Sequence, residues 1–598
     1  MQNKTIMQRL DALRSFMSEK HLDAFIFPST DPHNGEYVPD HWKGREWISG
    51  FDGSAGTAVV TASDAALWTD SRYFIAAAAQ LDGTGFSLMK ERISGTPTVA
   101  QWLAQTLRDI PMPRIGLDGM VCSAAMVENL SDELAEAGSF VVDTSYDPLA
   151  FIWHDRPEIP INPIAIHPLE YAGETAQSKL QRIRRAMADC HADALLVTAL
   201  DDIAWALNLR GCDVHCNPVF VAYLLVENDS ATLFADKRKI SQQVAQYLGC
   251  IGVENAPYEE VPKRLAEIED GSIMMDAETV NHNLFHAPLC RVVVAPSPIP
   301  AMKAVKNEVE IEGMRNAMKR DGVAMVRFLI WLEKAVAEGE QTEMSIDRKL
   351  TQLRAGQSLY KGLSFDTIAG YADHGAIVHY EATADTDVTL QKQGLLLLDS
   401  GAQYLDGTTD ITRTIALGPV SDEERKVYTL VLKGHLRLQN LKFPDGACGS
   451  QLDAVARAPL WEHGLNFLHG TGHGVGAYLN VHEGPHQIRM EWKPAPIHAG
   501  MTVTNEPGIY VEGKFGVRIE NTMVAMPYMD TPFGSFLKFE PLTLCPIDMT
   551  PVDFSMLTPQ ELQWLDEYHN KVYDALAPML TAEEKEWLGR ATNRKAGK

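Results

Sequence analysis

The N-terminal half of the chain contains a repeat, and this duplication limits the fold more than any other feature of the sequence. Two segments follow the same order: an amphipathic helical pattern, an apolar strand pattern, and a stretch that carries tryptophan. The strand reads HLDAFIFPS from His21 in the first segment and HADALLVTA from His191 in the second. Alternating helices and apolar strands predict that each segment forms an α/β domain, with a mixed sheet covered by helices.

Two proline-rich stretches divide the chain further. EIPINPIAIHP separates the repeats, and APSPIPAMKAVK precedes a long amphipathic helical pattern over residues 308–338. Proline stops helices and central strands, so we expect both stretches to lie between domains. Short strands and glycine-rich turns follow, and two helices with threonine N-caps begin at Thr558 and Thr581. The predicted domains are residues 1–160, 161–303 and 304–535, followed by a C-terminal helical extension at residues 536–598 that packs on the third domain.

Composition excludes several classes of protein. The 53 basic and 79 acidic residues give a net charge of −26, which disfavours nucleic acid and anionic membrane surfaces as partners. The 8 cysteines are thinly spread, which indicates free thiols in a reducing compartment. The chain shows neither a secretory signal nor an apolar run near the about 20 residues of a spanning helix. We therefore expect a cytoplasmic protein, with disorder confined to the basic tail at residues 593–598.

The stretch LLLLDSGAQYLDGTTDITRT carries the first two candidate functional residues. A fully apolar strand ends in Asp399, Asp406-Gly407 is a turn candidate, and Asp410 falls in a second strand pattern. A hairpin would bring the two carboxylates near each other. The register stays open, because a symmetric turn at Asp406-Gly407 places Asp399 opposite about Thr414 unless a bulge or a longer loop intervenes.

Three histidines lie in the glycine-rich stretch FLHGTGHGVGAYLNVHEGP. His469 and His473 have the spacing of two ligands on a helix, but the four glycines around them would each cost a helix about 1 kcal/mol. The glycines instead predict an open backbone that a ligand or metal can approach closely. Together with His482, these histidines are candidates for a functional site.

Two more acids, Glu506 and Glu520, fall on predicted strands, and Ile519 beside Glu520 indicates a buried position there. Charged groups rarely occupy such positions unpaired. Four carboxylates in one pocket, with Asp399 and Asp410, would repel one another by several kcal/mol per pair at about 4 Å, and two divalent cations would cancel that charge. Carboxylate oxygens with one or two imidazoles suit Mn²⁺, Co²⁺, Zn²⁺ or Fe²⁺.

With the motifs DGTTDITRT, HGTGHGVG, NVHEGP and NEPGIY, this ordered set of residues resembles the pita-bread metallopeptidases. Among them it is most similar to the long, three-domain type of aminopeptidase P, over essentially the whole chain. The resemblance implies two related creatinase-like α/β domains, then a pita-bread α+β catalytic domain with the C-terminal helical extension. It also implies a metal-dependent aminopeptidase that removes the first residue from peptides with proline at the second position.

The resemblance further implies a ligand set for two divalent ions. Asp399 would bind one ion, His473 and Glu506 would bind the other, and Asp410 and Glu520 would bridge the pair. The ions are usually Mn²⁺ in this family, with Co²⁺ or Zn²⁺ as alternatives. Such a pair generates hydroxide near neutral pH and polarises the scissile carbonyl.

Further site residues follow from the same resemblance. His379, in GAIVHYEAT, joins His469 and His482 as a catalytic and substrate-binding histidine that contacts substrate, carries protons or stabilises the oxyanion; which does which stays open. Arg518 would neutralise and orient the ligand carboxylates. Arg72 of the first domain is a candidate for restricting entry to short peptides, and its counterpart in the repeat, Arg238, leaves a structural role open as the alternative. The family resemblance also implies a homodimer.

Two other functions stay open from the sequence. A prolidase, which cuts only Xaa-Pro dipeptides, shares the fold and the ligand set but normally lacks the second repeat. A non-catalytic binding module would reuse the fold to hold a peptide, but such modules lose metal ligands. Comparing the cleavage of Arg-Pro-Pro and of Gly-Pro distinguishes the aminopeptidase from a prolidase. Measuring the metal content distinguishes it from a binding module.

Overall fold

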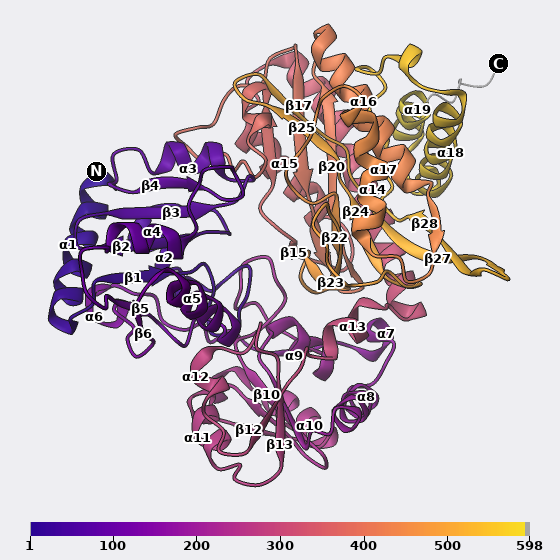
Figure 1. Ribbon diagram of the computed structural model, residues 1–598. Helices are drawn as coiled ribbons and strands as arrows, with labels where there is room; N and C mark the ends of the chain where they lie inside the picture. Colours follow the sequence, from indigo (N-terminus) through magenta and orange to yellow (C-terminus); the bar gives the residue numbers. More distant parts are fainter. Residues whose placement is uncertain (1, 593–598) are drawn as a thin grey trace. The chain divides into compact units, whose positions relative to one another are not determined.

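A computed structural model describes residues 2–592 and divides into two compact units. The first comprises Met1–Ile166 with Glu174–Ile299, and the second comprises His167–Gly173 with Pro300–Lys598. In Figure 1 the first unit runs from indigo to magenta, and the second ends in orange and yellow. The basic tail predicted to be disordered, residues 593–598, lies outside the described residues. None of the helices in residues 2–592 combines the length and the apolar character that a membrane span requires.

The first unit holds two six-stranded sheets with the same strand order. The first sheet runs β4 (Ser87–Lys90), β3 (Ala65–Thr69), β2 (Thr57–Thr61), β1 (Ala24–Phe27), β5 (Arg114–Leu117), β6 (Val141–Asp143). The second runs β12 (Val253–Ala256), β11 (Ala231–Phe234), β10 (Tyr223–Glu227), β8 (Ala194–Val197), β13 (Ser272–Met275), β14 (Arg291–Val294). In each sheet the central strand is antiparallel to one neighbour and parallel to the other. The predicted pair of related α/β domains with mixed sheets is therefore present.

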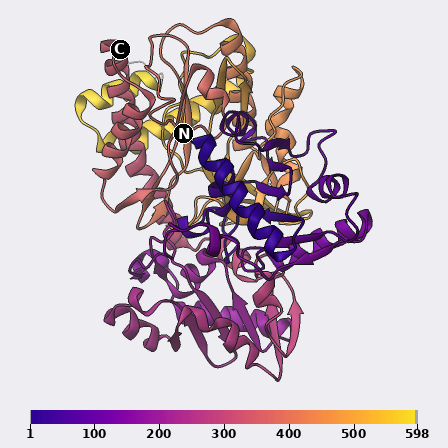
Figure 2. The ribbon, with the colours of Figure 1, turned by 90° about the vertical axis from the view of Figure 1, so that its left-hand side faces the viewer.

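Helices cover both faces of each sheet, which explains why β1 and β8 are buried throughout. Phe25 and Phe27 of β1 pack in one cluster with α1 (Gln2–Lys20), while Ala24 and Ile26 pack on the opposite face. Figure 2, viewed from the side of α1, shows this helix in front of the sheet. Successive strand residues point to opposite faces, so two apolar layers require a continuous apolar strand.

Helices of the second unit begin where the sequence predicts. α14 (Glu308–Glu338) has Asn307 as its N-cap, with a capping box completed by Glu310. Thr558 and Thr581 cap α18 (Pro559–Leu576) and α19 (Ala582–Ala591) through the backbone N–H three residues on. Apolar residues of α18 and α19 share a hydrophobic cluster with α16 (Asp422–Gln439), so the C-terminal helices pack on this unit.

Antiparallel strands form the part of the second unit that carries the candidate site. β17 (Leu395–Ser400) lies between β16 (Ile368–Tyr371) and β20 (Ile411–Ala416). A second sheet runs β21 (Lys442–Pro444), β28 (Gly534–Pro541), β27 (Asn521–Thr531), β24 (Thr502–Asn505). Two hairpin-like pairs join β22 (Gly472–Gly474) to β23 (Glu483–Ile488), and β25 (Gly508–Val511) to β26 (Phe515–Arg518).

The structure corrects the predicted hairpin. Asp399 pairs with Thr412, and β18 (Ala402–Tyr404) pairs with β19 (Gly407–Thr408) in the same register, so the turn is Leu405-Asp406. The register that the sequence left open is therefore set at Thr412, two residues from the position that a symmetric turn at Asp406-Gly407 would give. The reason is tertiary: Gly407 lies in a strand against α14, where a Cβ would come within 3.1 Å of the Met314 Cα. The glycine allows a close approach and does not form the turn.

The predicted strand positions of three acids also need correction. Asp410 lies one residue before β20, Glu506 one residue after β24, and Glu520 between β26 and β27. Each acid lies just outside a strand and not within one. The regular ladder of each strand ends beside these residues, so the side chain does not have to follow the alternation of faces within the strand.

Candidate metal centre

Strand pairing brings the ends of several strands together in the second unit. Asn505 of β24 is opposite Asn521 of β27, which places the adjacent residues Glu506 and Glu520 side by side. The backbone N–H of Glu520 donates to the Thr412 carbonyl at 3.1 Å, linking this pair to β20 and so to the strand that follows Asp410. Residues far apart in the sequence therefore meet because an end of β20, in one sheet, lies beside the adjacent ends of β24 and β27 in another.

His473 lies among the acids. Its Nε2 is 3.5 Å from Asp410 Oδ2 and 3.4 Å from Glu506 Oε1, while its Nδ1 donates to the Gly474 carbonyl at 2.8 Å. That donation leaves Nε2 as the nitrogen that faces the carboxylates. Ligand atoms of Asp410, His473 and Glu520 all lie within 4.8 Å of one another. The structure thus brings these three predicted ligands into one cluster, with Glu506 in contact.

The carboxylates are held at an electrostatic cost. Burial raises the pKa of Glu520 well above its usual range, and the charges of Asp410 and Asp399 raise it further. Burial likewise raises the pKa of Asp399 and of Glu506. For His473 burial lowers the pKa, but the hydrogen bond with Asp410 and the charge of Glu506 raise it to about 9. The cluster therefore favours additional positive charge.

Cations of the predicted kind fit the residues present. Asp399 Oδ1 is buried and has no hydrogen-bond partner, although the other oxygen of this carboxylate is bound by Arg518. A buried oxygen without a donor is costly unless a cation satisfies it. Oxygen ligands with one imidazole suit a divalent first-row ion. The five residues are therefore chemically able to hold metal, and their individual ligand roles remain predictions.

Arg518 connects one carboxylate to the surrounding residues. It is 1% exposed, and its Nη2 and Nε donate to Asp399 Oδ2 at 2.6 and 3.1 Å. Nε also lies 3.2 Å from Thr412 Oγ1, which in turn donates to Glu520 Oε2 at 2.8 Å. The arginine thus contacts a predicted ligand directly, in the position expected for a group that orients it.

Tyr510 is a site residue that the sequence reasoning missed. Its hydroxyl accepts a hydrogen bond from Arg518 Nη1 at 2.7 Å and lies 2.8 Å from His469 Nε2. His469 Nδ1 donates to the Gly470 carbonyl at 2.7 Å, so in the neutral imidazole the Tyr510 hydroxyl is the donor to Nε2. The sequence pattern places Glu506 and Tyr510 four residues apart in one predicted strand, and this even spacing was the available signal, although β25 begins only at Gly508.

The other two predicted histidines lie in the same unit. The His482 ring packs edge-on against the His473 ring, with centroids 4.3 Å apart. His379 follows Val378, whose carbonyl accepts a hydrogen bond from Arg518 Nη2 at 3.4 Å. The backbone next to His379 is therefore tied to the arginine that contacts Asp399.

Arg72 belongs to the first unit, and its guanidinium binds the carboxylate of Asp70, two residues earlier in the chain. Its Nε and Nη2 donate to Asp70 at 3.0 and 2.7 Å, and Arg238 makes the same fork with Asp236 at 3.0 and 2.6 Å. The repeat thus preserves the arrangement in both domains. The additional role of Arg72 in restricting entry remains a prediction.

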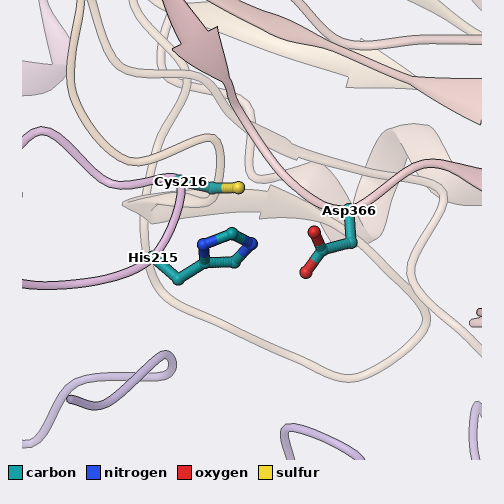
Figure 3. Close-up of side chains that lie close together, drawn as sticks. All are labelled: His215, Cys216 and Asp366. Atoms are coloured by element: carbon teal, nitrogen blue, oxygen red, sulfur yellow. The ribbon is translucent and has the colours of Figure 1, made fainter. Parts of the chain in front are cut away.

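No disulfide joins the eight cysteines, all of which lie among the described residues. Figure 3 shows the side chains of His215 and Cys216, which are consecutive in a loop of the first unit. Asp366, drawn with them, belongs to the second unit, and we assign no metal site to these residues.

Four family models match the chain in sequence order. The Creatinase/Prolidase N-terminal domain matches residues 9–147 and, as a second model, residues 155–310. Metallopeptidase family M24 matches residues 312–526, and the C-terminal region of peptidase M24 matches residues 535–595. This order confirms the predicted fold class of two creatinase-like domains, a catalytic domain and a C-terminal region.

Relatives match over nearly the whole chain. Probable Xaa-Pro aminopeptidase P of Laccaria bicolor is 40% identical, over 98% of this chain and 92% of its own. The crystal structure of X-prolyl aminopeptidase from Caenorhabditis elegans, described as a cytosolic enzyme with a di-nuclear active site, matches with a TM-score of 0.93 at 35% identity, over 98% of this chain and 99% of its own. An Xaa-Pro dipeptidase from Bacillus anthracis covers 63% of this chain and 100% of its own, with a TM-score of 0.52 at 25% identity. The chain therefore belongs to metallopeptidase family M24 and, within it, to the aminopeptidases P.

Proposed function

We infer that the chain is an Xaa-Pro aminopeptidase, which removes the N-terminal residue from peptides that have proline at the second position. The observation that carries this inference is the cluster of buried Asp410 and Glu520 with the partly exposed His473 and Glu506. It occurs in a chain whose full length matches aminopeptidases of this specificity. Short peptides are therefore the proposed substrates.

We propose that two divalent cations occupy the centre, most often Mn²⁺, with Asp399 on one ion, His473 and Glu506 on the other, and Asp410 and Glu520 between them. Bound there, the cations would lower the pKa of a water molecule, polarise the scissile carbonyl and offset the carboxylate charges. His473 suits this role because Nδ1 is held by the Gly474 carbonyl, which leaves Nε2 free to coordinate.

The surrounding side chains would hold the substrate and move protons. Hydrolysis of an amide requires a proton for the leaving nitrogen, and imidazoles near neutral pH supply it well. We propose His379, His469 and His482 for this work and for binding the peptide. The Tyr510 hydroxyl keeps His469 Nε2 as an acceptor, and Arg518 holds that hydroxyl, so the imidazole has one defined tautomer.

Proline at the second position needs a dedicated site. The peptide bond before proline has no N–H, so a protease that binds this group cannot recognise it. The proposed enzyme would instead orient the scissile carbonyl through the positive charge of the cations and would recognise the proline ring by the shape of the site. We also propose that it acts in the cytoplasm as a homodimer and that Arg72 helps to exclude long peptides.

The prolidase alternative is less favoured by length. The dipeptidase of known structure spans 63% of this chain, whereas the aminopeptidase spans 98%. The binding-module alternative is less favoured because all five predicted ligands are present, whereas such modules lose metal ligands.

The test pairs metal analysis with peptide hydrolysis. The purified protein, loaded with Mn²⁺ and dialysed, should hold about two ions per chain and release arginine from Arg-Pro-Pro. Activity confined to Gly-Pro would favour the prolidase. A protein that holds no metal and cleaves neither peptide would favour the binding module and refute the proposal.

A further inference from the structure

A single buried carboxylate gathers the segment around His379. Glu343, the first residue of α15 (Glu343–Ala355), is 0% exposed. Its Oε1 accepts from the Tyr371 backbone N–H at 2.8 Å and from His374 Nδ1 at 2.9 Å, and its Oε2 accepts from the Tyr380 hydroxyl at 2.8 Å. One side chain of α15 thus binds three points of a segment only ten residues long.

The residues that bind Glu343 lie on both sides of His379 in the sequence. Tyr380 follows it directly, and His374 precedes it by five residues in the 3₁₀ turn η4 (Ala372–Ala376). On the other side, the Val378 carbonyl accepts from Arg518 Nη2 at 3.4 Å. Both neighbours of His379 are therefore tethered, one to the arginine that contacts Asp399 and one to Glu343.

The tethered segment is also closely packed. The rings of His374 and Tyr380 lie against each other with centroids 4.5 Å apart. η4 contacts β26, the strand that ends in Arg518, and a Cβ on Gly516 would collide with the Gly375 carbonyl oxygen. Such close packing restricts the backbone conformations that residues 371–380 can adopt. The hydrogen bonds to Glu343 therefore help to fix where this segment lies.

The two side chains that donate to Glu343, those of Tyr380 and His374, both keep their protons readily, so the hydrogen bonds that hold the segment persist. Burial raises the pKa of the Tyr380 hydroxyl, which therefore stays a donor. The hydrogen bond with Glu343 raises the pKa of His374, which favours a proton on both ring nitrogens. A buried carboxylate that loses one of several donors becomes costly, so the network acts as a unit.

We propose that Glu343 is a positioning residue for His379, which it places through the Tyr380 hydroxyl and His374. This proposal rests on the proposed function, because it assigns His379 a part in peptide hydrolysis. The anchor contacts none of the predicted metal ligands, so it should set the geometry of the imidazole and leave metal binding unchanged.

The principal test is a double-mutant cycle between Tyr380→Phe and His379→Ala. Tyr380→Phe alone should lower kcat by on the order of 10-fold, with KM and metal content unchanged, since a misplacement of about 1 Å can cost about 100-fold and this change removes only one of the three contacts. In the His379→Ala background, Tyr380→Phe should cause no further loss, because its only route of action is gone. Glu343→Gln should follow the same pattern, and Tyr380→Phe remains the informative variant if that protein does not fold.

Tyr428→Phe is the matched control. This tyrosine is also buried, and its hydroxyl donates to the Asp548 carbonyl at 2.8 Å. Its removal should change stability while kcat stays within about twofold of the parent in both backgrounds. If Tyr380→Phe lowers kcat by equal factors with and without His379, the positioning role is refuted, since equal factors indicate two independent effects.

Hydrogen exchange gives a readout that does not depend on activity. In the metal-free protein, Tyr380→Phe should speed amide exchange in residues 371–382 and leave exchange in β24 and β27 unchanged. Unchanged exchange across residues 371–382 would refute the anchor even in an active enzyme. If the parent protein cleaves no Xaa-Pro peptide, the proposed function fails by itself, while faster exchange confined to this segment would still support the anchoring.

Discussion

The buried acids of the candidate centre are compensated only in part by groups of the fold, of which His473 lies 3.5 Å from Asp410. Asp410 and Glu520 are 4% and 1% exposed, yet Arg518 binds neither of them and contacts Asp399 instead. Desolvation of a charged group costs several kcal/mol unless opposite charge is close. The closely spaced carboxylates repel one another in the protein without metal, and bound cations would remove that repulsion. We therefore expect metal content and activity to change together.

Glu520→Gln tests that connection at one residue. The substitution keeps the size and the contact with Thr412 but removes one charge from the cluster. We expect Mn²⁺ affinity and kcat/KM each to fall more than about 10-fold, measured by metal analysis after dialysis and by hydrolysis of Arg-Pro-Pro. Glu512→Gln, at an exposed turn position, is the control and should match the parent protein. Full activity in Glu520→Gln would contradict the bridging role.

His379→Ala separates chemistry from metal binding. The imidazole is proposed to act on the substrate, so we expect metal content to persist while kcat falls about 100-fold or more. Exposed His463 provides a control substitution to alanine with no expected effect. Loss of metal from His379→Ala would show that this histidine belongs among the ligands.

At the scale of elements, the C-terminal helices support the strands that carry the acids. Arg413 of β20 is 2% exposed, and its Nη1 donates to the Glu520 carbonyl at 2.6 Å. Its Nη2 lies 2.8 Å from the hydroxyl of Tyr568 in α18 and 2.9 Å from Asn521 Oδ1 at the start of β27. A buried guanidinium needs all its donors satisfied, so α18 completes the contacts that join β20 to β27.

Tyr568→Phe should weaken this junction. The change removes one hydroxyl and leaves a buried donor of Arg413 with fewer partners, which should lower the free energy of unfolding by about 1–3 kcal/mol. Urea denaturation followed by fluorescence measures the shift. Tyr528→Phe, at an exposed position of β27, should leave the midpoint unchanged. Equal stability of the two variants would argue that the hydroxyl contributes nothing to the junction.

For the whole molecule, neutral buried histidines connect stability to pH. His435 is 0% exposed, donates from Nδ1 to the Asn505 carbonyl at 3.1 Å, and accepts at Nε2 from Asn521 Nδ2 at 3.2 Å. Burial and the charge of Arg413 lower its pKa to about 3. Burial lowers the pKa of His569 to about 4 in the same way. Both rings are neutral in the folded protein at pH values where the unfolded chain is protonated.

The sign of the effect follows from these shifts. An unfolded histidine has a pKa near 6.5, so below that pH the unfolded state binds more protons than the folded state, and the contribution of His435 is lost as the pH falls toward about 3. Each such group contributes up to about 1.4 kcal/mol per pH unit. Between pH 7 and pH 5, the wild-type protein should therefore lose more stability than His435→Gln in urea denaturation. Parallel pH dependence of the two proteins would contradict the assignment.

Much of the architecture could be predicted because it depends on short stretches of sequence. The bounds of α14 and the caps at Thr558 and Thr581 follow from helical periodicity and local hydrogen bonding. The repeated HLDAFIFPS and HADALLVTA stretches led to two sheets of the same strand order. Long-range contacts could not be obtained in this way, as Gly407 illustrates: its role depends on Met314 in a distant helix.

The sequence by itself determined which residue types are available to the centre, their order, and the duplicated domains that precede them. Only the tertiary structure decided that Glu506 and Glu520 lie beside the strand that follows Asp410, that Tyr510 joins Arg518 to His469, and that Glu343 anchors the segment of His379. The physical reason is that periodicity and capping act over a few residues, whereas strand register and buried ion contacts depend on which distant surfaces pack together.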